Sequence, residues 1–111
     1  MSKIKSKRSK ACEFSANERK AICERDSYRC VICGSSQALT VAHLISRGRG
    51  GLGIRQNGAL LCVKCHQIVD QGSNSEVRKA YQQFLRNYLE MHYPEFTDDE
   101  RVYKKWSLSK R

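Results

Sequence analysis

Two cysteine pairs with the same internal spacing constrain this chain more than any other feature of its sequence. Cys30 and Cys33 form one CxxC pair, Cys62 and Cys65 form a second, and 28 residues separate the two. Four thiolates complete the tetrahedral shell of one zinc ion, which makes such a site structural and closed. The separation exceeds the roughly 15–20 residues of the common tandem pattern by about one β-hairpin with a wide loop. We therefore predict a treble-clef arrangement that zinc stabilises.

Two other chemistries fit part of the cysteine pattern. The run from Cys62 to His66 has the CxxCH spacing of a haem attachment site, but that chemistry usually needs export and leaves Cys30 and Cys33 without a role. A redox pair is the other alternative, although two matched pairs in one small domain favour zinc. Cys23 is expected to be a small buried hydrophobe, and Cys12 has no assignment.

The charge balance indicates the kind of partner. The 111 residues include 21 Lys and Arg against 11 Asp and Glu, a formal net charge of +10, which points to a polyanion. The length suits one domain. No apolar run approaches the ~18 residues of a membrane helix, and no apolar stretch follows the basic start MSKIKSKRSK, so we expect no secretory signal. A cytoplasmic location, with no membrane partner, is the prediction, and thiols there favour metal binding.

Local patterns predict an α+β order of elements. Ser15 and Glu18 fit a capping box that opens a helix over about 16–26. Strands are expected at 38–45, with His43 and its alternate neighbours on one face, and at 58–61. A helix from the second cysteine pair should end near Gln71 and Gly72.

The C-terminal third should be helical. A helix over 75–92 carries one apolar stripe at spacings of three and four, and Pro94 ends it. Thr97 and Glu100 fit a second capping box, which predicts a short helix over 98–106 with Val102, Tyr103 and Trp106 facing inward. We divide the chain into a basic, flexible tail at 1–10, a domain at 11–92 and a C-terminal extension at 93–111 that packs on the domain.

Between the cysteine pairs lie His43 on the first strand, Asn57 after a glycine-rich loop and His66 directly after Cys65. This pattern resembles the HNH endonuclease family. The segments that carry the resemblance are Cys-Val-Ile-Cys-Gly, Ala-His-Leu-Ile-Ser-Arg-Gly-Arg-Gly-Gly and Asn-Gly-Ala-Leu-Leu-Cys. The flanks Lys-Ala-Cys-Glu-Phe and Tyr-Lys-Lys-Trp look like a phage and prophage-associated subgroup. The resemblance implies a small ββα-metal core of the treble-clef, His-Me finger type with flanking helices. It also implies hydrolysis of DNA to 5′-phosphate and 3′-hydroxyl ends.

The spacing also makes chemical sense for phosphodiester hydrolysis. A neutral imidazole can take the proton of the attacking water, and His43 on a rigid strand is the best candidate base. His66 and Asp70 lie four residues apart on one helix face, where they suit a divalent cation such as Mg²⁺, Mn²⁺, Co²⁺ or Ni²⁺. Within the resemblance, Asn57 orders the loop through hydrogen bonds to the backbone and ligates no metal.

Other residues in this segment have simpler interpretations. A lone histidine on an apolar strand is most often a core residue, and an aspartate at a helix end is most often solvated. The glycine-rich loop is either a flexible connector or a cradle for phosphates, in which Arg47 and Arg49 contact the substrate backbone. Many HNH proteins carry an acidic or histidine ligand before the base; Ala42 stands at that position here.

Two functions are therefore open. The first is a metal-dependent HNH endonuclease that acts on DNA and on no small molecule, in the cytoplasm of a bacterial host. The second is a non-catalytic treble-clef zinc module that binds DNA. Retention of His43, Asn57 and His66 together favours the nuclease, whereas Ala42 favours the binding module. A double-strand cut would need a dimer or a partner protein, and the phage-like subgroup would make that partner a terminase.

Overall fold

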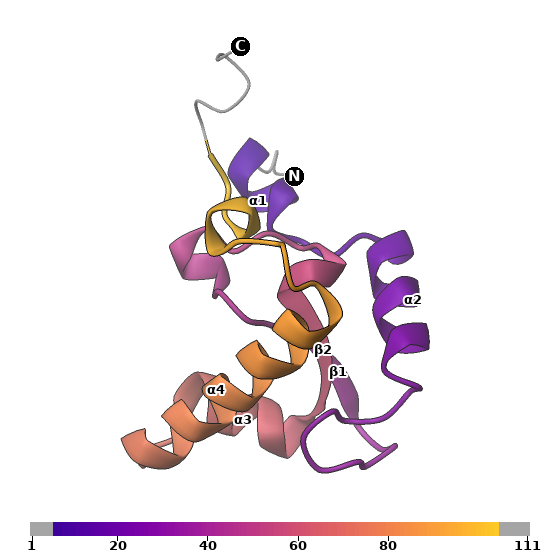
Figure 1. The fold of residues 1–111 in the computed structure, drawn as a ribbon, viewed down its shortest axis with the longest axis vertical. Coiled ribbons are helices and arrows are strands. Elements are labelled where there is room, and N and C mark those ends of the chain that lie inside the picture. The colour runs from indigo at the N-terminus through magenta and orange to yellow at the C-terminus, as the bar shows by residue number, and fades with distance from the viewer. Residues whose placement is uncertain (1–5, 105–111) are drawn as a thin grey trace, which may run out of the picture.

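The computed structural model describes residues 6–104, which form a central two-stranded hairpin with helices on both sides (Figure 1). The predicted α+β, ββα-metal architecture is confirmed. In chain order the elements are α1 (Lys7–Ala11), α2 (Ala16–Arg25), β1 (Leu39–His43), the short 3₁₀ helices η1 (Arg47–Arg49) and η2 (Arg55–Asn57), β2 (Gly58–Cys62), α3 (Val63–Gln71), α4 (Ser75–His92) and the 3₁₀ helix η3 (Asp98–Arg101). No helix within these residues is long and apolar enough to cross a membrane.

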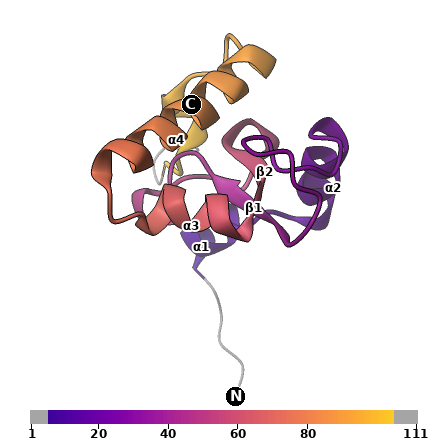
Figure 2. The ribbon, with the colours of Figure 1, turned by 90° about the horizontal axis from the view of Figure 1, so that it is seen from below.

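The hairpin carries the cysteines at one end and His43 at the other. β1 and β2 pair antiparallel, with Leu39 opposite Cys62 and His43 opposite Gly58. Helix α2 lies on one side of the hairpin and α3 and α4 lie on the other (Figures 1 and 2). Val41 packs towards α2 and Ala42 packs among the cysteines, as the predicted alternation requires, whereas Leu39 contacts both clusters.

The predicted apolar stripe of α4 is only partly buried. Leu85 and Leu89 are fully buried against the hairpin, but Val77 is 42% exposed and Phe84 45%. The helix spans Ser75–His92 as predicted, and its N-cap is Asn74, whose side chain accepts hydrogen bonds from the next turn. The N-terminal half of α4 therefore leaves apolar side chains on the surface beside its polar ones.

The two predicted capping boxes differ in outcome. At Thr97 both hydrogen bonds with Glu100 form, as predicted, but the helix stops at Arg101 instead of continuing to 106. Val102 instead bridges to Gly51 as a β-pair. At Ser15 only half of the box exists: Ser15 caps the backbone of Glu18, while the Glu18 carboxylate turns away to the backbone and guanidinium of Arg55. The Glu18 carboxylate thus binds the charged Arg55 in place of the backbone N–H of Ser15. The hydrogen bonds from Arg55 lower the pKa of Glu18.

Part of the basic N-terminal segment, predicted as a tail, is helical. Residues 7–11 form α1, and the Arg8 guanidinium donates hydrogen bonds to the carbonyls of Arg47 and Gly48. Residues 1–5 of the predicted tail lie outside the described part of the chain, as does Trp106. The C-terminal segment contacts the domain through Arg101, which is buried and donates to the carbonyl of Gln56.

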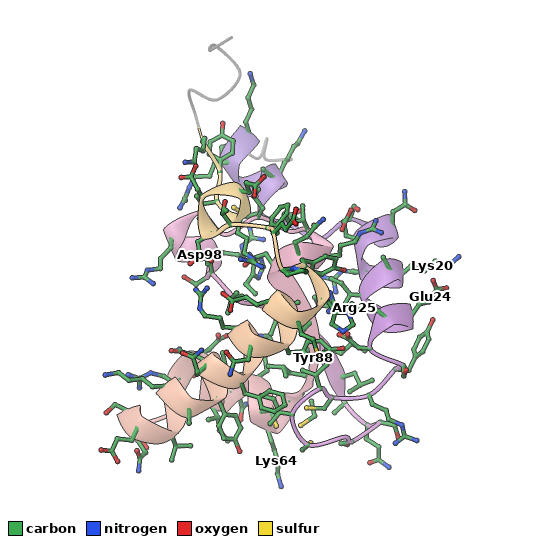
Figure 3. The ribbon with its side chains drawn as sticks, in the orientation of Figure 1. Lys20, Glu24, Arg25, Lys64, Tyr88 and Asp98 are labelled. Atoms are coloured by element: carbon green, nitrogen blue, oxygen red, sulfur yellow. The ribbon has the colours of Figure 1, made fainter. Side chains whose placement is uncertain are left out.

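A buried polar network joins α2, β2 and α4. The carboxylate of Asp26 accepts hydrogen bonds from Arg25, from the Tyr88 hydroxyl at 2.6 Å and from the backbone N–H of Leu60 at 2.9 Å. Arg25 and Tyr88 face one another across the space between α2 and α4 (Figure 3). Burial, together with the bond to Asp26, raises the pKa of Tyr88 to about 12. The network fixes the helices on the two sides of the hairpin relative to each other.

Candidate active site

Four cysteine sulfurs meet at one end of the hairpin. Their Sγ atoms, from Cys30, Cys33, Cys62 and Cys65, all lie within 4.8 Å of one another. Cys30 and Cys33 come from the turn before β1, where Gly34 takes a positive φ of 81° and the Cys33 N–H points at the Cys30 sulfur. Cys62 ends β2, and Cys65 lies in the first turn of α3. The predicted pairing of a turn with a helix N-terminus is therefore present.

The sulfur geometry fits a zinc ion. Thiolates bound at ~2.3 Å in a tetrahedron lie about 3.8 Å apart, and the Sγ atoms of Cys33 and Cys62 are separated by 3.6 Å. Burial raises the pKa of the Cys30 thiol, but backbone N–H groups outweigh it and bring that pKa down to about 7. Such N–H donors favour the thiolate, which is the form that binds metal. These four residues could hold one zinc ion.

His43 lies at the opposite end of the hairpin, in a defined orientation. Its Nε2 is 2.8 Å from the backbone carbonyl of Cys12, and its ring packs 4.5 Å from that of Phe14. A carbonyl only accepts, so Nε2 must carry the hydrogen, and the lone pair of the neutral ring is on Nδ1. Burial is the main reason that the pKa of His43 falls below its ordinary value of 6.5, with Arg47 and His66 acting in the same direction and Asp70 opposing them. His43 is thus a neutral base with one free nitrogen.

His66 is oriented by a threonine that the sequence did not single out. The Thr40 hydroxyl lies 2.8 Å from the carbonyl of Leu61 and 2.7 Å from Nδ1 of His66. Its single hydrogen goes to the carbonyl, so it accepts from Nδ1–H, and the lone pair of neutral His66 is on Nε2. That nitrogen is 3.1 Å from Oδ2 of Asp70, one helical turn along α3.

The pair of His66 and Asp70 fits a divalent cation. Two electron-pair donors that face each other at 3.1 Å need a proton or a cation between them. Adjacent ligands of an octahedral Mg²⁺ lie about 2.9 Å apart, close to this separation. Among residues 6–104, the four cysteines are the one group of three or more possible ligands with atoms within 4.8 Å. His66 and Asp70 could therefore supply two ligands to a divalent cation.

Asn57 makes the backbone hydrogen bonds that the resemblance implied. Its side chain is fully buried, accepts from the N–H of Ile45 at 2.9 Å, and donates to the carbonyls of Ile45 and Leu52. These bonds hold the two ends of the glycine-rich loop together beside His43. Asn57 lies away from the cavity described next, so it acts on the site through the loop.

Glycines in this loop allow the backbone to pack closely. A Cβ on Gly53 would lie 2.2 Å from the backbone of Glu13, and one on Gly51 would lie 1.6 Å from the carbonyl of Ile45. The Gly53 N–H also donates to the carbonyl of Ala11. Packing of this kind fixes the segment that presents the Cys12 carbonyl to His43. At these two positions the glycines serve packing, which neither sequence interpretation of the loop had included.

One cavity of about 690 Å³ brings the site residues together. His43, His66 and Asp70 all line it, although they come from β1 and α3. Arg47 lines it too, and its guanidinium is anchored by a hydrogen bond to the Cys12 carbonyl. Ala42 is fully buried among the cysteines and offers no ligand.

Sequence reasoning missed two charged residues on the wall of this cavity. Arg19 from α2 and Glu13 from the segment before it both line it. Arg19 belongs to no local motif, and the packing of α2 and of residues 11–14 against the hairpin brings both residues here. The missed signal for Glu13 was its place in the flank Lys-Ala-Cys-Glu-Phe, next to the phenylalanine that contacts His43.

Arg49 does not share this cavity with Arg47. It lines a second cavity of about 410 Å³, together with Ser46 and residues of α4. The loop between β1 and η2 therefore presents its two arginines to different recesses. The sequence had grouped them as one phosphate-binding pair.

Comparisons with known proteins agree with this geometry. The family model described as HNH endonuclease matches residues 30–71. Among solved structures, the chain is similar to the Type IV phosphorothioation-dependent restriction endonuclease ScoMcrA, with a TM-score of 0.58 and 23% identity over 74% of this chain and 17% of that one. The chain thus spans a small part of that protein's length, and the likeness is one of fold. A search of the curated proteins found no match. Residues 30–71, which hold the four cysteines, both site histidines and Asn57, are therefore the part of this chain that is similar to the HNH endonuclease family.

Proposed function

We propose that this protein is a metal-dependent endonuclease that hydrolyses DNA phosphodiester bonds in the cavity lined by His43, His66 and Asp70. The convergence of these side chains with Arg47 in one recess is the observation that carries the proposal. The family match and the fold shared with a restriction endonuclease support DNA as the substrate class. Zinc in the cysteine cluster would serve the fold and not the reaction, because four thiolates leave no open position.

His43 acts as the general base. Its free Nδ1 accepts a proton from the attacking water, while the Cys12 carbonyl holds Nε2–H and stabilises the imidazolium that results. The lowered pKa keeps the ring neutral at pH 7, so the base needs no prior deprotonation. A positioned base of this kind contributes about 10²–10⁴-fold to the rate.

The other charged residues of the cavity act on the phosphate. Arg47 and Arg19 neutralise its non-bridging oxygens. His66 and Asp70 would hold the divalent cation, with Thr40 fixing the His66 ring. A bound cation supplies Lewis acidity at a phosphoryl oxygen and at the departing 3′ oxygen. Asn57 is a positioning residue, because it contacts only the loop.

Incubation of purified protein with supercoiled plasmid and Mg²⁺, Mn²⁺, Co²⁺ or Ni²⁺ tests the proposal. We expect nicked or linear product with 5′-phosphate ends, and a loss of at least about 100-fold in rate for His43→Ala. Zinc content, circular dichroism and DNA affinity of His43→Ala should equal those of the wild type. Lys20→Ala, exposed on the outer face of α2 (Figure 3), is the matched control. A wild type that binds DNA but cuts with none of the metals would instead favour the non-catalytic binding module.

The biological setting stays a prediction from the sequence resemblance. A phage terminase as partner and the bacterial cytoplasm as location belong to this proposal. They predict copurification of the chain with a terminase subunit when the two are expressed together.

A further inference from the structure

A second recess lies beside the proposed active site, and its charge is of one sign. The cavity of about 410 Å³ is lined by three cationic side chains, those of Arg49, Lys79 and Arg86, and by no carboxylate. Ser46 and two glutamines of α4, Gln82 and Gln83, supply its neutral polar groups. The first cavity differs, because Glu13 and Asp70 line it together with its arginines. A cation would be repelled from the second recess, whereas an anion would be attracted.

The cations of the second recess are not equally available. Arg86 is held by Asp98 at 2.9 Å and by Glu90 at 3.3 Å, so its charge is largely compensated. Arg49 and Lys79 are exposed, and within residues 6–104 no carboxylate pairs with either. These two residues therefore carry the free positive charge of the recess, and Arg86 forms a fixed part of its wall.

The two recesses share a wall. Ser46 lines both, and the turn that it opens separates them, with Arg47 on the side of the first and Arg49 on the side of the second. The turn is held in place, since the Ser46 carbonyl accepts from the N–H groups of Arg49 and Gly51. The Arg8 guanidinium also binds the Arg47 and Gly48 carbonyls. A chain of phosphates that occupies the first recess would meet the second directly beside it.

We propose that the recess between η1 and the N-terminal half of α4 binds a phosphate of the same DNA, flanking the one that is cleaved. Arg49 and Lys79 neutralise this phosphate, and Gln82 and Gln83 offer amide contacts to its oxygens or to the adjoining sugar. Such contacts set the register of the substrate on the enzyme and carry no sequence information. The inference rests on the proposed function, and it assigns a role to α4, which lies outside the segment matched by the HNH family.

Salt-dependent DNA binding tests this site. The protein is zinc-loaded His43→Ala, so that a labelled duplex of about 20 base pairs stays intact. Removal of one cationic side chain that neutralises a phosphate should reduce the slope of log K against log salt by about 0.9. We expect that reduction for Lys79→Ala and for Arg49→Ala. Lys64→Ala is the control, because Lys64 projects from α3 at the cysteine end (Figure 3) and lines neither recess. The salt slope of this variant should equal that of the parent protein.

The outcomes separate this inference from the proposed function. Wild-type cleavage of the same duplex reports on the first cavity. If the wild type cleaves but Lys79→Ala and Arg49→Ala keep the full salt slope, the second site is wrong and the nuclease stands. If both variants lose affinity for polyglutamate and keep their affinity for DNA, the recess serves an acidic protein and the inference is overturned. Thermal unfolding of each variant, expected to match that of the parent, excludes misfolding as a cause.

Discussion

The two ends of the β1–β2 hairpin are built by different means. At the cysteine end, where Leu39 pairs with Cys62, four sulfurs lie within 4.8 Å of one another and could be joined by one metal ion. At the histidine end, where His43 pairs with Gly58, the geometry depends on hydrogen bonds. The Cys12 carbonyl fixes the His43 ring, and Asn57 fixes the glycine-rich loop. One end gathers four sulfurs that could close around a metal ion, and the other is open as a cavity. The same short hairpin thus supports both a structural site and a candidate reactive one.

Removal of metal should have the largest effect, because the cysteine end anchors both strands and α3. Treatment with a strong chelator is expected to abolish the cooperative thermal transition followed by circular dichroism. Structural zinc in small domains is worth roughly 10–16 kcal/mol, which is comparable to the whole stability of a domain of this size. Cys62→Ser should have a similar effect, whereas Cys23→Ser, outside the cluster, should unfold like the wild type. Less than about half an equivalent of zinc in freshly purified protein would contradict the closed site.

Asn57→Ala tests the hydrogen-bonded end. The substitution leaves the Ile45 N–H and the carbonyls of Ile45 and Leu52 without their partner. Since each unpaired buried group costs about 1–3 kcal/mol, the free energy of unfolding in urea should fall by about 3 kcal/mol while zinc is retained. Asn87→Ala, at an exposed position of α4, is the control and should cost less than about 0.5 kcal/mol. Equal stability of the two variants would show that the loop does not depend on Asn57.

The pH profile of cleavage probes the same end more finely. His43 acts as a base only when neutral, and burial, aided by Arg47 and His66, lowers its pKa below 6.5. With metal at saturation, kcat/KM should therefore rise with pH, with the midpoint of the rise below pH 6.5. Around pH 7 the profile should already have levelled off. A midpoint above 6.5 would mean that the favourable charge of Asp70 outweighs burial, or that another group is the base.

The same contrast explains how much the sequence could predict. The cysteine end depends on pairs of cysteines three residues apart, and this spacing alone was enough to predict the cluster of four. The i,i+4 relation placed Asp70 beside His66 for the same reason. Thr40 and Arg19 could not be predicted, because they reach the site only through strand register and the packing of α2. The missing half of the Ser15 capping box has a similar cause, since its glutamate found Arg55, 37 residues away.

The N-terminal helix α1 is an element that the sequence did not predict. A run rich in Lys and Ser has no apolar pattern, so residues 7–10 were expected to belong to a flexible tail, whereas they lie in α1. Their order depends on Arg8 and Arg47, which connect α1 to the loop beside the active site. A basic segment can therefore be structural where backbone carbonyls of a folded loop accept its hydrogen bonds.

The central claim is that the two ends of the hairpin hold metal for different purposes. A single titration tests it most directly: the rate of plasmid cleavage by zinc-loaded protein is followed as Mn²⁺ is added, with bound zinc measured in the same samples. We predict that cleavage begins only with Mn²⁺ while zinc stays at about one per chain. For Asp70→Asn, the Mn²⁺ midpoint should rise by at least about 10-fold with zinc unchanged. Cleavage without a second metal, or identical titrations for Asp70→Asn and wild type, would contradict the account.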